Sequence, residues 1–314
     1  MMHRARSRRV SNRYVCSFIY LLLTFFSFSL AEAGGLRHLF DLTHAAGSPL
    51  ALPSDVAVAK DGRIFVVDGG NHRVVVFGRN GKFLRSIGAK GGGKGLFSEP
   101  VGIGLDAKDR VYVADRGNHR IQIFDSQGQL LRTFPLEIGG KKIRPIDVTV
   151  SPQDETIYVT GNNNHSVMAY SANGKLIKTW GGQGSNPGEF RYPATLIMTR
   201  DNAIGVVDVL NSRVQLFEPD GKLLTTMGSW GVLPGQLFRP KGVAVDRKER
   251  FYVSDSYMEV IEVFDNQTRF LHVLGGAGQP HKFTSPAGIA VDEHNRLYVA
   301  EMLANKVSVY ALEP

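Results

Sequence analysis

The sequence DGRIFVVDGGNHRVVVFGRNGKFLRSIG, from Asp61 to Gly88, is one copy of a pattern that the chain repeats six times. The next copy is KDRVYVADRGNHRIQIFDSQGQLLRTF, from Lys108 to Phe134, with the same order of apolar runs and turns. Each copy follows a proline, and successive prolines are 45 to 48 residues apart: Pro53, Pro100, Pro145, Pro193, Pro240 and Pro286. Repetition at this period indicates a repeat architecture.

Each copy contains four short runs with the composition of β-strands. In the first copy these are Asp55–Ala59, Ile64–Val67, Val74–Phe77 and Phe83–Ile87, rich in Val, Ile and Phe and separated by turn residues such as Asn80-Gly81. Four antiparallel strands joined by hairpins form one propeller blade. Because no segment after residue 33 has the 3.6-residue apolar period, we expect few helices.

The two ends of the repeat array predict how the ring closes. The sixth copy stops at its third strand, Val307–Tyr310, and Leu36–Leu42 aligns with the fourth strand of the other copies. We therefore expect an all-β, six-bladed β-propeller of four-stranded antiparallel blades, in which the N-terminal strand completes the last blade. Residues 34–314 form a single domain in this interpretation, with no linker left over.

The strand-connecting triplets carry a resemblance to a known family. They read Asn71-His72-Arg73 and Asn118-His119-Arg120, with the variants Asn164-His165-Ser166 and Asn211-Ser212-Arg213. Together with the loop GGQGSNPGEFRYP, from Gly181 to Pro193, they resemble the NHL repeat over essentially all of residues 36–314. The resemblance implies a propeller that serves as a platform for binding protein, for binding RNA or, more rarely, for catalysis.

Residues 1–33 lie outside the repeats and are typical of a secretory signal peptide. Five arginines precede the uncharged run Tyr14–Leu30, which is followed by the small-x-small sequence Ala31-Glu32-Ala33. We expect cleavage there and a secreted, periplasmic or otherwise extracytoplasmic protein. The alternative is an uncleaved membrane anchor at residues 14–30, because seventeen residues approach the length of a spanning helix.

Removing this leader changes the bulk properties of the chain. The net charge of +8 includes five arginines and Glu32 from the leader, a net +4, so that +4 remains. Such a small positive excess makes nucleic-acid binding unlikely for an exported protein. The only cysteine, Cys16, also lies in the leader. The mature chain therefore contains no disulfide, iron–sulfur cluster or covalently attached haem.

Comparison of the copies assigns most of the charged residues to structural roles. Five copies end their second strand with an acid, and four of these have a base five residues later: Asp68, Asp115, Asp208, Asp255 and Glu301 with Arg73, Arg120, Arg213 and Lys306. We expect ion pairs that join strands two and three. Three equivalent histidines, His72, His119 and His165, suggest zinc, but equivalent points of neighbouring blades lie too far apart to share one ion at ~2.1 Å. No metal site is predicted from them.

Recognition is expected on the loops, which are fixed by a rigid scaffold. The turns between strands two and three and the inter-blade loops emerge on one face, whose candidate binding residues are His72, Arg73, His119, Arg120, Asn164, His165, Arg213, Tyr192 and Trp230. The copies differ most there in blades three to five, at 162–164, 209–210 and 257–259. Under these loops we expect four buried aromatic residues: Phe97, Phe190, Phe238 and Phe283.

Three functions fit this sequence. The first is an exported, monomeric, non-catalytic scaffold, without a cofactor, that binds a protein, peptide or glycan on the loop face. The second follows from resemblance to propeller lyases and gluconolactonase-like hydrolases, which use a channel metal such as Ca or Zn. Its candidate channel residues are Asp55, Asp147 and Thr195, which replace the glycines of the other copies. The third is RNA binding by the basic loop residues.

Overall fold

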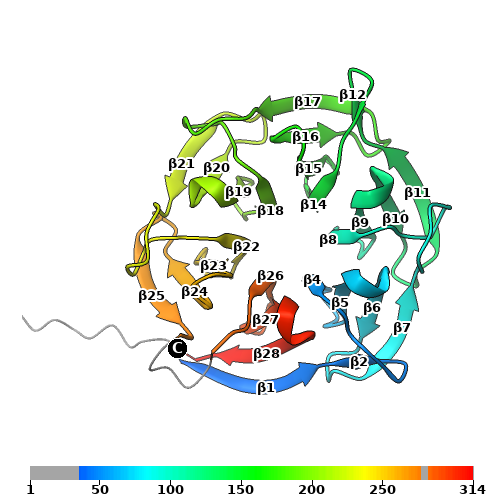
Figure 1. Ribbon diagram of the computed structural model, residues 1–314, viewed down its shortest axis with the longest axis horizontal. Helices are drawn as coiled ribbons and strands as arrows, with labels where there is room; N and C mark the ends of the chain where they lie inside the picture. Colours follow the sequence, from blue (N-terminus) through cyan, green and yellow to red (C-terminus); the bar gives the residue numbers. More distant parts are fainter. Residues whose placement is uncertain (1–34, 277–281, 314) are drawn as a thin grey trace, which may run out of the picture. The chain divides into compact units, whose positions relative to one another are not determined.

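The computed structural model describes residues 35–276 and 282–313. They form six four-stranded antiparallel sheets arranged around a central channel, as predicted (Figure 1). Each blade runs from an inner strand that begins at one of the repeated prolines to an outer strand on the circumference. The runs of Val, Ile and Phe make the second and third strands the most deeply buried.

The strands of the first three blades are β4 (Pro53–Val58), β5 (Ile64–Asp68), β6 (Arg73–Phe77) and β7 (Phe83–Ile87); β8 (Pro100–Leu105), β9 (Val111–Asp115), β10 (Arg120–Phe124) and β11 (Leu130–Pro135); and β14 (Pro145–Val150), β15 (Ile157–Gly161), β16 (Ser166–Tyr170) and β17 (Leu176–Gly181). Those of blades 4 and 5 are β18 (Pro193–Met198), β19 (Ile204–Asp208), β20 (Arg213–Phe217) and β21 (Leu223–Met227); and β22 (Pro240–Val245), β23 (Phe251–Asp255), β24 (Val260–Phe264) and β25 (Phe270–Leu274). Blade 6 consists of β26 (Pro286–Val291), β27 (Arg296–Glu301), β28 (Lys306–Leu312) and β1 (Leu36–Leu42).

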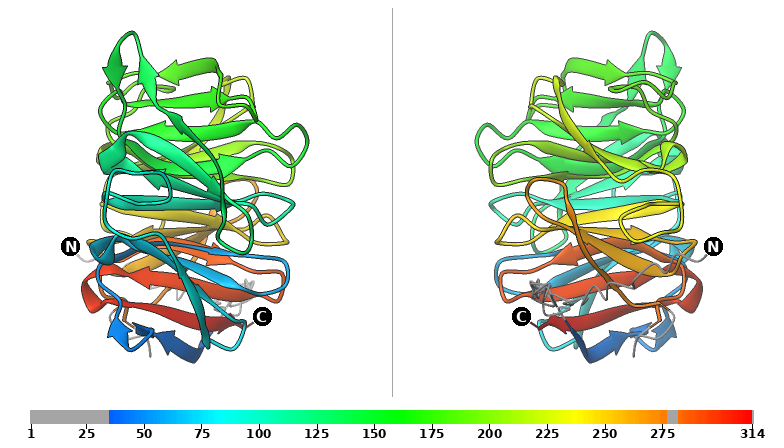
Figure 2. Two further views of the ribbon diagram at one scale, coloured as in Figure 1. Left: turned by 90° about the vertical axis from the view of Figure 1, so that its right-hand side faces the viewer. Right: turned by 90° about the vertical axis from the view of Figure 1, so that its left-hand side faces the viewer.

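The N-terminal strand closes the ring. β1 pairs antiparallel with β28, with Leu36 opposite Leu312 and Leu42 opposite Val307, so that blade 6 takes its outer strand from the other end of the chain. The two side views show these strands, blue and red, next to each other (Figure 2). Two small hairpins lie outside the blades: β2 (His44–Ala45) with β3 (Ser48–Pro49), and β12 (Glu137–Ile138) with β13 (Lys141–Lys142).

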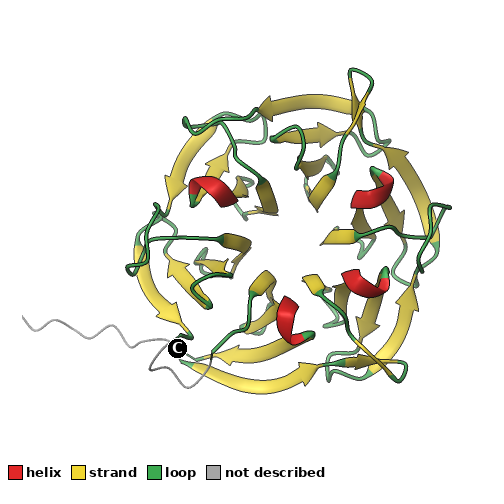
Figure 3. Ribbon diagram, in the orientation of Figure 1, coloured by secondary structure: helices red, strands yellow, loops and turns green. Residues whose placement is uncertain are grey.

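Short 3-10 turns connect strands two and three in four blades. They are η1 (Gly69–Asn71), η2 (Arg116–Asn118), η3 (Val209–Asn211) and η4 (Met302–Ala304). All four surround one mouth of the channel, where they are the only helical segments of the described chain (Figure 3). We call this side, formed by these turns and the inter-blade loops, the turn face. The expectation of few helices is confirmed.

The core lies between the blades. Buried apolar residues form six clusters, and each cluster combines residues of two adjacent blades, including blades 6 and 1. Each also contains at least one fully or nearly fully buried residue from the loop above it, such as Leu50, Phe97, Ile143, Phe190, Leu237 and Phe283. These loop residues seal the interfaces from the turn face.

One of the four predicted loop aromatics is wrong by one position. Leu237, not Phe238, is buried at the blade 4–blade 5 interface. Trp230 forms an isolated β-bridge with Leu237, as Lys90 does with Phe97 in the equivalent loop. Phe238 instead lies half-buried at the surface, with its ring 4.3 Å from that of Tyr257. The shift frees an aromatic side chain for the turn face.

No helix among the described residues is long and apolar enough to cross a membrane. The leader predicted at residues 1–33, and the anchor at 14–30 that is its alternative, lie outside the described residues.

The loop assignments predict unequal costs for two Phe→Ala substitutions. F190A empties a fully buried site and should lower the free energy of unfolding by about 3–5 kcal/mol. F238A removes a half-buried ring and should cost roughly 1 kcal/mol. Urea unfolding of both variants measures the difference, and equal losses would show that Phe238 is the core residue after all.

Candidate functional site

A buried ion pair closes the turn in three blades. Asp68, Asp115 and Asp208 are fully buried, and each accepts a hydrogen bond from the Nε of an arginine five residues later. The N–O distances are 2.7, 2.7 and 2.9 Å for Arg73, Arg120 and Arg213, whose side chains are only 13–15% exposed. The predicted clasp is therefore present, and the three arginines face the scaffold more than the solvent. In blade 6, Lys306 lies 3.4 Å from Glu301.

The same arginines hold the inter-blade loops. Arg120 donates from both Nη atoms to the carbonyls of Gly92, Gly93 and Leu96, and Arg213 donates to those of Asn186 and Glu189. Since backbone carbonyls already occupy these guanidinium groups, the arginines are poorly placed to bind phosphates of an RNA.

The three equivalent histidines cap the turns. His72, His119 and His165 have left-handed backbones, with φ of 54°, 55° and 51°. Nδ1 of His72 accepts a hydrogen bond from Glu99 N, and Nδ1 of His165 accepts one from Tyr192 N, so each ring supports the loop of the following blade. Nδ1 of His119 instead lies 3.2 Å from the Ile143 carbonyl oxygen, so that here the ring nitrogen donates the hydrogen bond. The structure thus spreads these side chains around the ring.

Blade 3 departs from the pattern because Gly161 replaces the acid. The side chain of Asn164 folds over this glycine, and a Cβ on Gly161 would lie only 2.0 Å from its Oδ1. The neighbouring Asn163 accepts a hydrogen bond from Arg144 N, which keeps the preceding loop attached without a carboxylate. Asn164 is therefore a packing residue of the turn.

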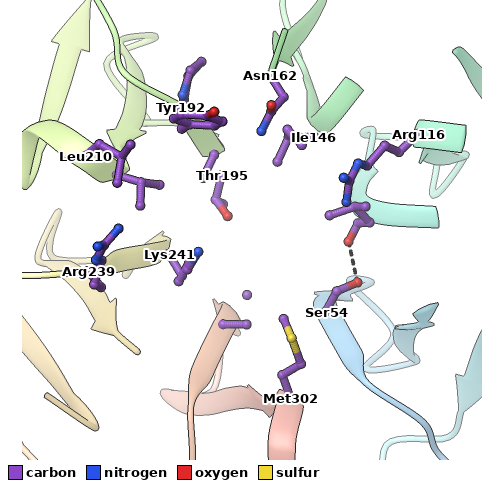
Figure 4. A pocket seen from close by; sticks show the side chains of 16 residues that line it. Ser54, Arg116, Ile146, Asn162, Tyr192, Thr195, Leu210, Arg239, Lys241 and Met302 are labelled. Atoms are coloured by element: carbon purple, nitrogen blue, oxygen red, sulfur yellow. Dashed lines mark hydrogen bonds between the residues drawn. The ribbon is translucent and has the colours of Figure 1, made fainter. Parts of the chain in front are cut away.

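A pocket of about 430 Å³ lies at the channel mouth on the turn face. Its sixteen lining residues come from several blades and include three cations, Arg116, Arg239 and Lys241, but no acid (Figure 4). Burial and the neighbouring Arg239 lower the pKa of Lys241. Of the residues predicted from the sequence, the pocket brings together Tyr192 and Thr195. A site with several cations and no carboxylate favours an anionic ligand.

An exposed aromatic group lies beside this pocket. Phe238 lies between Trp230 and Tyr257, with ring centroids 6.3 and 4.3 Å away, and Arg239 lies 5.9 Å from the Phe238 ring. Trp230 is 72% exposed and Tyr257 66% exposed. We call Trp230, Phe238 and Tyr257 the aromatic platform. Because Arg239 lines the pocket and also lies over the Phe238 ring, the pocket adjoins the platform.

Deeper in the channel, the inner strands approach one another closely. A Cβ at Gly102, Gly242 or Gly288 would lie within 2.0–2.4 Å of atoms of the next blade, so these positions require glycine. The space beside Gly288 and Gly102 holds the carboxyl groups of Asp55 and Asp147. Both acids line a second cavity, of about 250 Å³, together with Thr195.

The two acids connect adjacent inner strands. Asp55 accepts hydrogen bonds from its neighbour Val56 and, at 2.9 Å, from Ile103 N of blade 2. Asp147 accepts one from Val148 N and, also at 2.9 Å, one from Leu196 N of blade 4. Each carboxyl oxygen already has a backbone donor. These residues are therefore built into the channel wall.

Burial changes the protonation of this pair. It raises the pKa of Asp55 to about 7, against the hydrogen bonds from Ile103 and Val56. Burial and then the charge of Asp55 raise the pKa of Asp147 well above its usual range. Two carboxyl groups that interact in a desolvated site favour sharing a proton.

A catalytic divalent metal does not fit the channel donors. Ca²⁺ takes six to eight oxygen ligands, and Zn²⁺ needs three protein ligands at a catalytic site. Asp55 and Asp147 are two carboxyls whose oxygens already accept backbone hydrogen bonds. No group of three or more His, Cys, Asp or Glu suitable for a metal occurs among residues 35–276 and 282–313.

Comparison with known proteins supports the architecture. A family described as "6-bladed beta-propeller" (DUF5128) matches residues 49–148. None of the curated proteins compared with the chain matches it.

Solved structures share the fold at low identity. A Bacteroides thetaiotaomicron protein of unknown function is 16% identical, with a TM-score of 0.72 over 90% of this chain and 76% of that one. A Xanthomonas campestris gluconolactonase is 19% identical, with a TM-score of 0.65 over 90% and 99%. A catalytically inactive virginiamycin B lyase from Staphylococcus aureus, solved with quinupristin, is 16% identical, with a TM-score of 0.63 over 90% and 88%. At these identities the likeness shows the propeller fold alone.

Sequence reasoning missed two of the three pocket cations. Arg116 and Lys241 occupy positions that differ from one copy to the next, so that no repeat pattern marks them. Lys241 follows the repeated Pro240, at a position that is Val101 in blade 2 and Ile146 in blade 3. The signal that could have identified Lys241 is a lysine at a position where blades 2 and 3 have apolar residues.

The acid pair predicts that stability falls as pH rises from about 4 to about 7. A folded-state pKa above the unfolded value means that the folded chain binds more protons in this range, and its advantage disappears as Asp55 ionises. The slope is at most about 1.4 kcal/mol per pH unit for each proton. Urea unfolding against pH measures it. The D55G/D147G variant places the glycine of blades 2, 5 and 6 at both positions. It should lose most of the part of this slope that the acid pair contributes. An unchanged slope would contradict the assignment.

Proposed function

We propose that the protein is a binding scaffold that takes an acidic, partly apolar peptide segment of a protein partner on its turn face. The observation that carries this proposal is the channel-mouth pocket, which has three cations and no acid and adjoins the aromatic platform. A carboxylate side chain of the ligand would enter the pocket, where charge-assisted hydrogen bonds are strongest out of bulk water. Its apolar neighbours would cover the platform.

Several exposed side chains support a peptide over a glycan. Val232, Leu233 and Leu303 are 64–67% exposed on the turn face, in addition to the platform rings. Aliphatic side chains match apolar groups of a peptide, whereas sugar rings are recognised by aromatic faces and polar groups. Clusters of aromatic residues and arginine are also typical of protein interfaces.

The proposal includes the finer features expected from the sequence. The chain would be an NHL-type propeller exported by its first 33 residues, either cleaved or retained as an anchor, and would meet its partner outside the cytoplasm. It would act as a monomer. No metal and no cofactor take part in the binding, which needs only side chains of the scaffold.

Selection from a random peptide library displayed on phage tests this function. Peptides that bind the wild-type protein should be enriched in Asp and Glu next to aromatic or aliphatic residues. R239A/K241A should weaken their binding about 100-fold or more, because two hydrogen bonds between charged groups are lost and each is worth about 1.5–3 kcal/mol. Calorimetry with the selected peptides provides the dissociation constants.

The matched control is R200A, because Arg200 lines a separate cavity formed by residues such as Lys60, Asp106 and Pro152 at the other ends of the inner strands. It should bind the selected peptides as the wild-type protein does. Peptides without acidic enrichment, or equal losses in R200A and R239A/K241A, would contradict the proposed site.

A further inference from the structure

Blades 2 and 4 hold their inter-blade loops with a buried glutamine. The Gln122 amide donates to the Leu96 carbonyl at 2.8 Å and to Asp115 at 3.1 Å, while its Oε1 accepts a hydrogen bond from Gly95 N. Gln215 makes the same three contacts, with Glu189, Asp208 and Gly188. An amide suits this place because it offers one acceptor to an N–H and donors to two acceptors.

Blade 5 has an acid in the same place. Glu262 is 1% exposed and accepts a hydrogen bond from Gly235 N at 3.0 Å, as the glutamine Oε1 does in blades 2 and 4. A carboxylate at this place has no hydrogens to donate, whereas the glutamine amide donates two. The arginine that accompanies each glutamine is also missing, because Val260 stands where blades 2 and 4 have Arg120 and Arg213.

The group next to Glu262 is a second buried acid. Asp255 is fully buried and uses its carboxylate oxygens to accept hydrogen bonds from Phe238 N at 2.6 Å and from Arg239 N at 2.9 Å. It also accepts from Tyr257 N and Met258 N. Asp255 therefore fixes the backbone of the aromatic platform and of a pocket cation. An ionised Glu262 would bring a second negative charge to this anchor.

We propose that Glu262 is a proton-operated latch for the loop formed by residues 229–239. With a proton, its carboxyl group replaces the glutamine: one oxygen accepts from Gly235 N and the O–H donates to an acceptor beside it. Without the proton, the donor is lost and two carboxylates face each other without an arginine, so that the loop loosens. The latch sets the pH at which the proposed binding surface is ordered.

The charges around the latch agree with this role. Burial raises the pKa of Glu262 to about 7, Gly235 N opposes the shift and Asp255 adds to it. Lys241 on β22 interacts with Asp255, and Arg239 in the loop interacts with Lys241. On β25, His272 pairs with Val263, one position from the Glu262–Val273 pair, and burial and Arg250 lower its pKa.

The direction of the effect follows from the sign of the shift. A carboxyl group with a raised folded-state pKa stabilises the structure while it is protonated, and this contribution disappears as pH rises through about 7. Binding on the turn face should therefore weaken on the alkaline side. This consequence rests on the proposed function, whereas the latch itself does not.

Hydrogen exchange of the ligand-free, full-length protein tests the latch. After correction for the chemical exchange rate, amides of residues 229–239 should lose about 30-fold protection between about pH 5.5 and about pH 8.5, since pH 5.5 lies about 1.5 units below the folded-state pKa of Glu262 and each unit corresponds to a factor of ten. In E262Q the protection should not depend on pH, because glutamine is the residue that blades 2 and 4 use. An equal pH dependence in E262Q and the wild-type protein overturns the proposal.

Two further variants keep the test independent of how well E262Q folds. V260R restores the arginine of blades 2 and 4 and should move the loop transition well below pH 7; a transition that stays near pH 7 overturns the proposal. Q215E places the acid next to Arg213 in blade 4, and the loop of residues 182–191 should keep its protection over the same pH range. A loss there equal to that of 229–239 also overturns it.

Binding measurements separate the latch from the proposed function. Peptides selected on the wild-type protein should bind less tightly at about pH 8.5 than at about pH 5.5, and this difference should vanish in E262Q. If the exchange results agree with the latch but no acidic peptide binds, the proposed function fails and the latch stands. If acidic peptides bind equally at both pH values while the loop transition is absent, the latch fails alone.

Discussion

In five of the six blades, a buried carboxylate at the end of the second strand determines how the inter-blade loop lies. In five blades this acid accepts a hydrogen bond from a backbone N–H seventeen residues earlier, at 2.6–2.8 Å: Asp68 from Ala51, Asp115 from Ser98, Asp208 from Arg191, Asp255 from Phe238 and Glu301 from Thr284. A desolvated negative charge is tolerable only when such donors surround it. Each bond ties a blade to the loop that crosses from the previous one, and the loops shape the channel mouth.

The repeat pattern made the fold predictable. Blade number, strand content and closure by β1 all follow from the spacing of the prolines and from the incomplete sixth copy. The ion pair of Asp68 with Arg73 was also visible, since both letters recur five residues apart. The hydrogen bond from Ala51 N to Asp68 could not be predicted, because nearly every residue has a backbone N–H and the sequence does not show which one donates. The Phe238 assignment failed for a related reason: loop residues lack the alternation that fixes register in a strand.

The site was less predictable because it uses positions where the copies disagree. Repeated residues such as His72 and Arg120 hold the scaffold together, whereas Arg116 and Lys241 each occur in one copy and Arg239 has only Arg144 of blade 3 as an equal. Tyr192 and Trp230, which were predicted, do lie at the pocket and at the platform. The Glu262 position could have been noticed from the sequence, since Gln122 and Gln215 are its equivalents. The role proposed for Glu262 depends on the burial of Asp255 beside it, which the sequence does not show.

Closure of blade 6 by β1 has a consequence for how the chain folds. Asp41 and Lys306, which form an ion pair at 3.1 Å, are separated by 265 residues, and the pairing of Leu36 with Leu312 spans the described domain. During synthesis β1 cannot pair until β28 has emerged. Contacts of such long range are slow to form, and an unpaired strand edge is prone to aggregation in the meantime. The first of the described strands to be made is thus among the last to be paired.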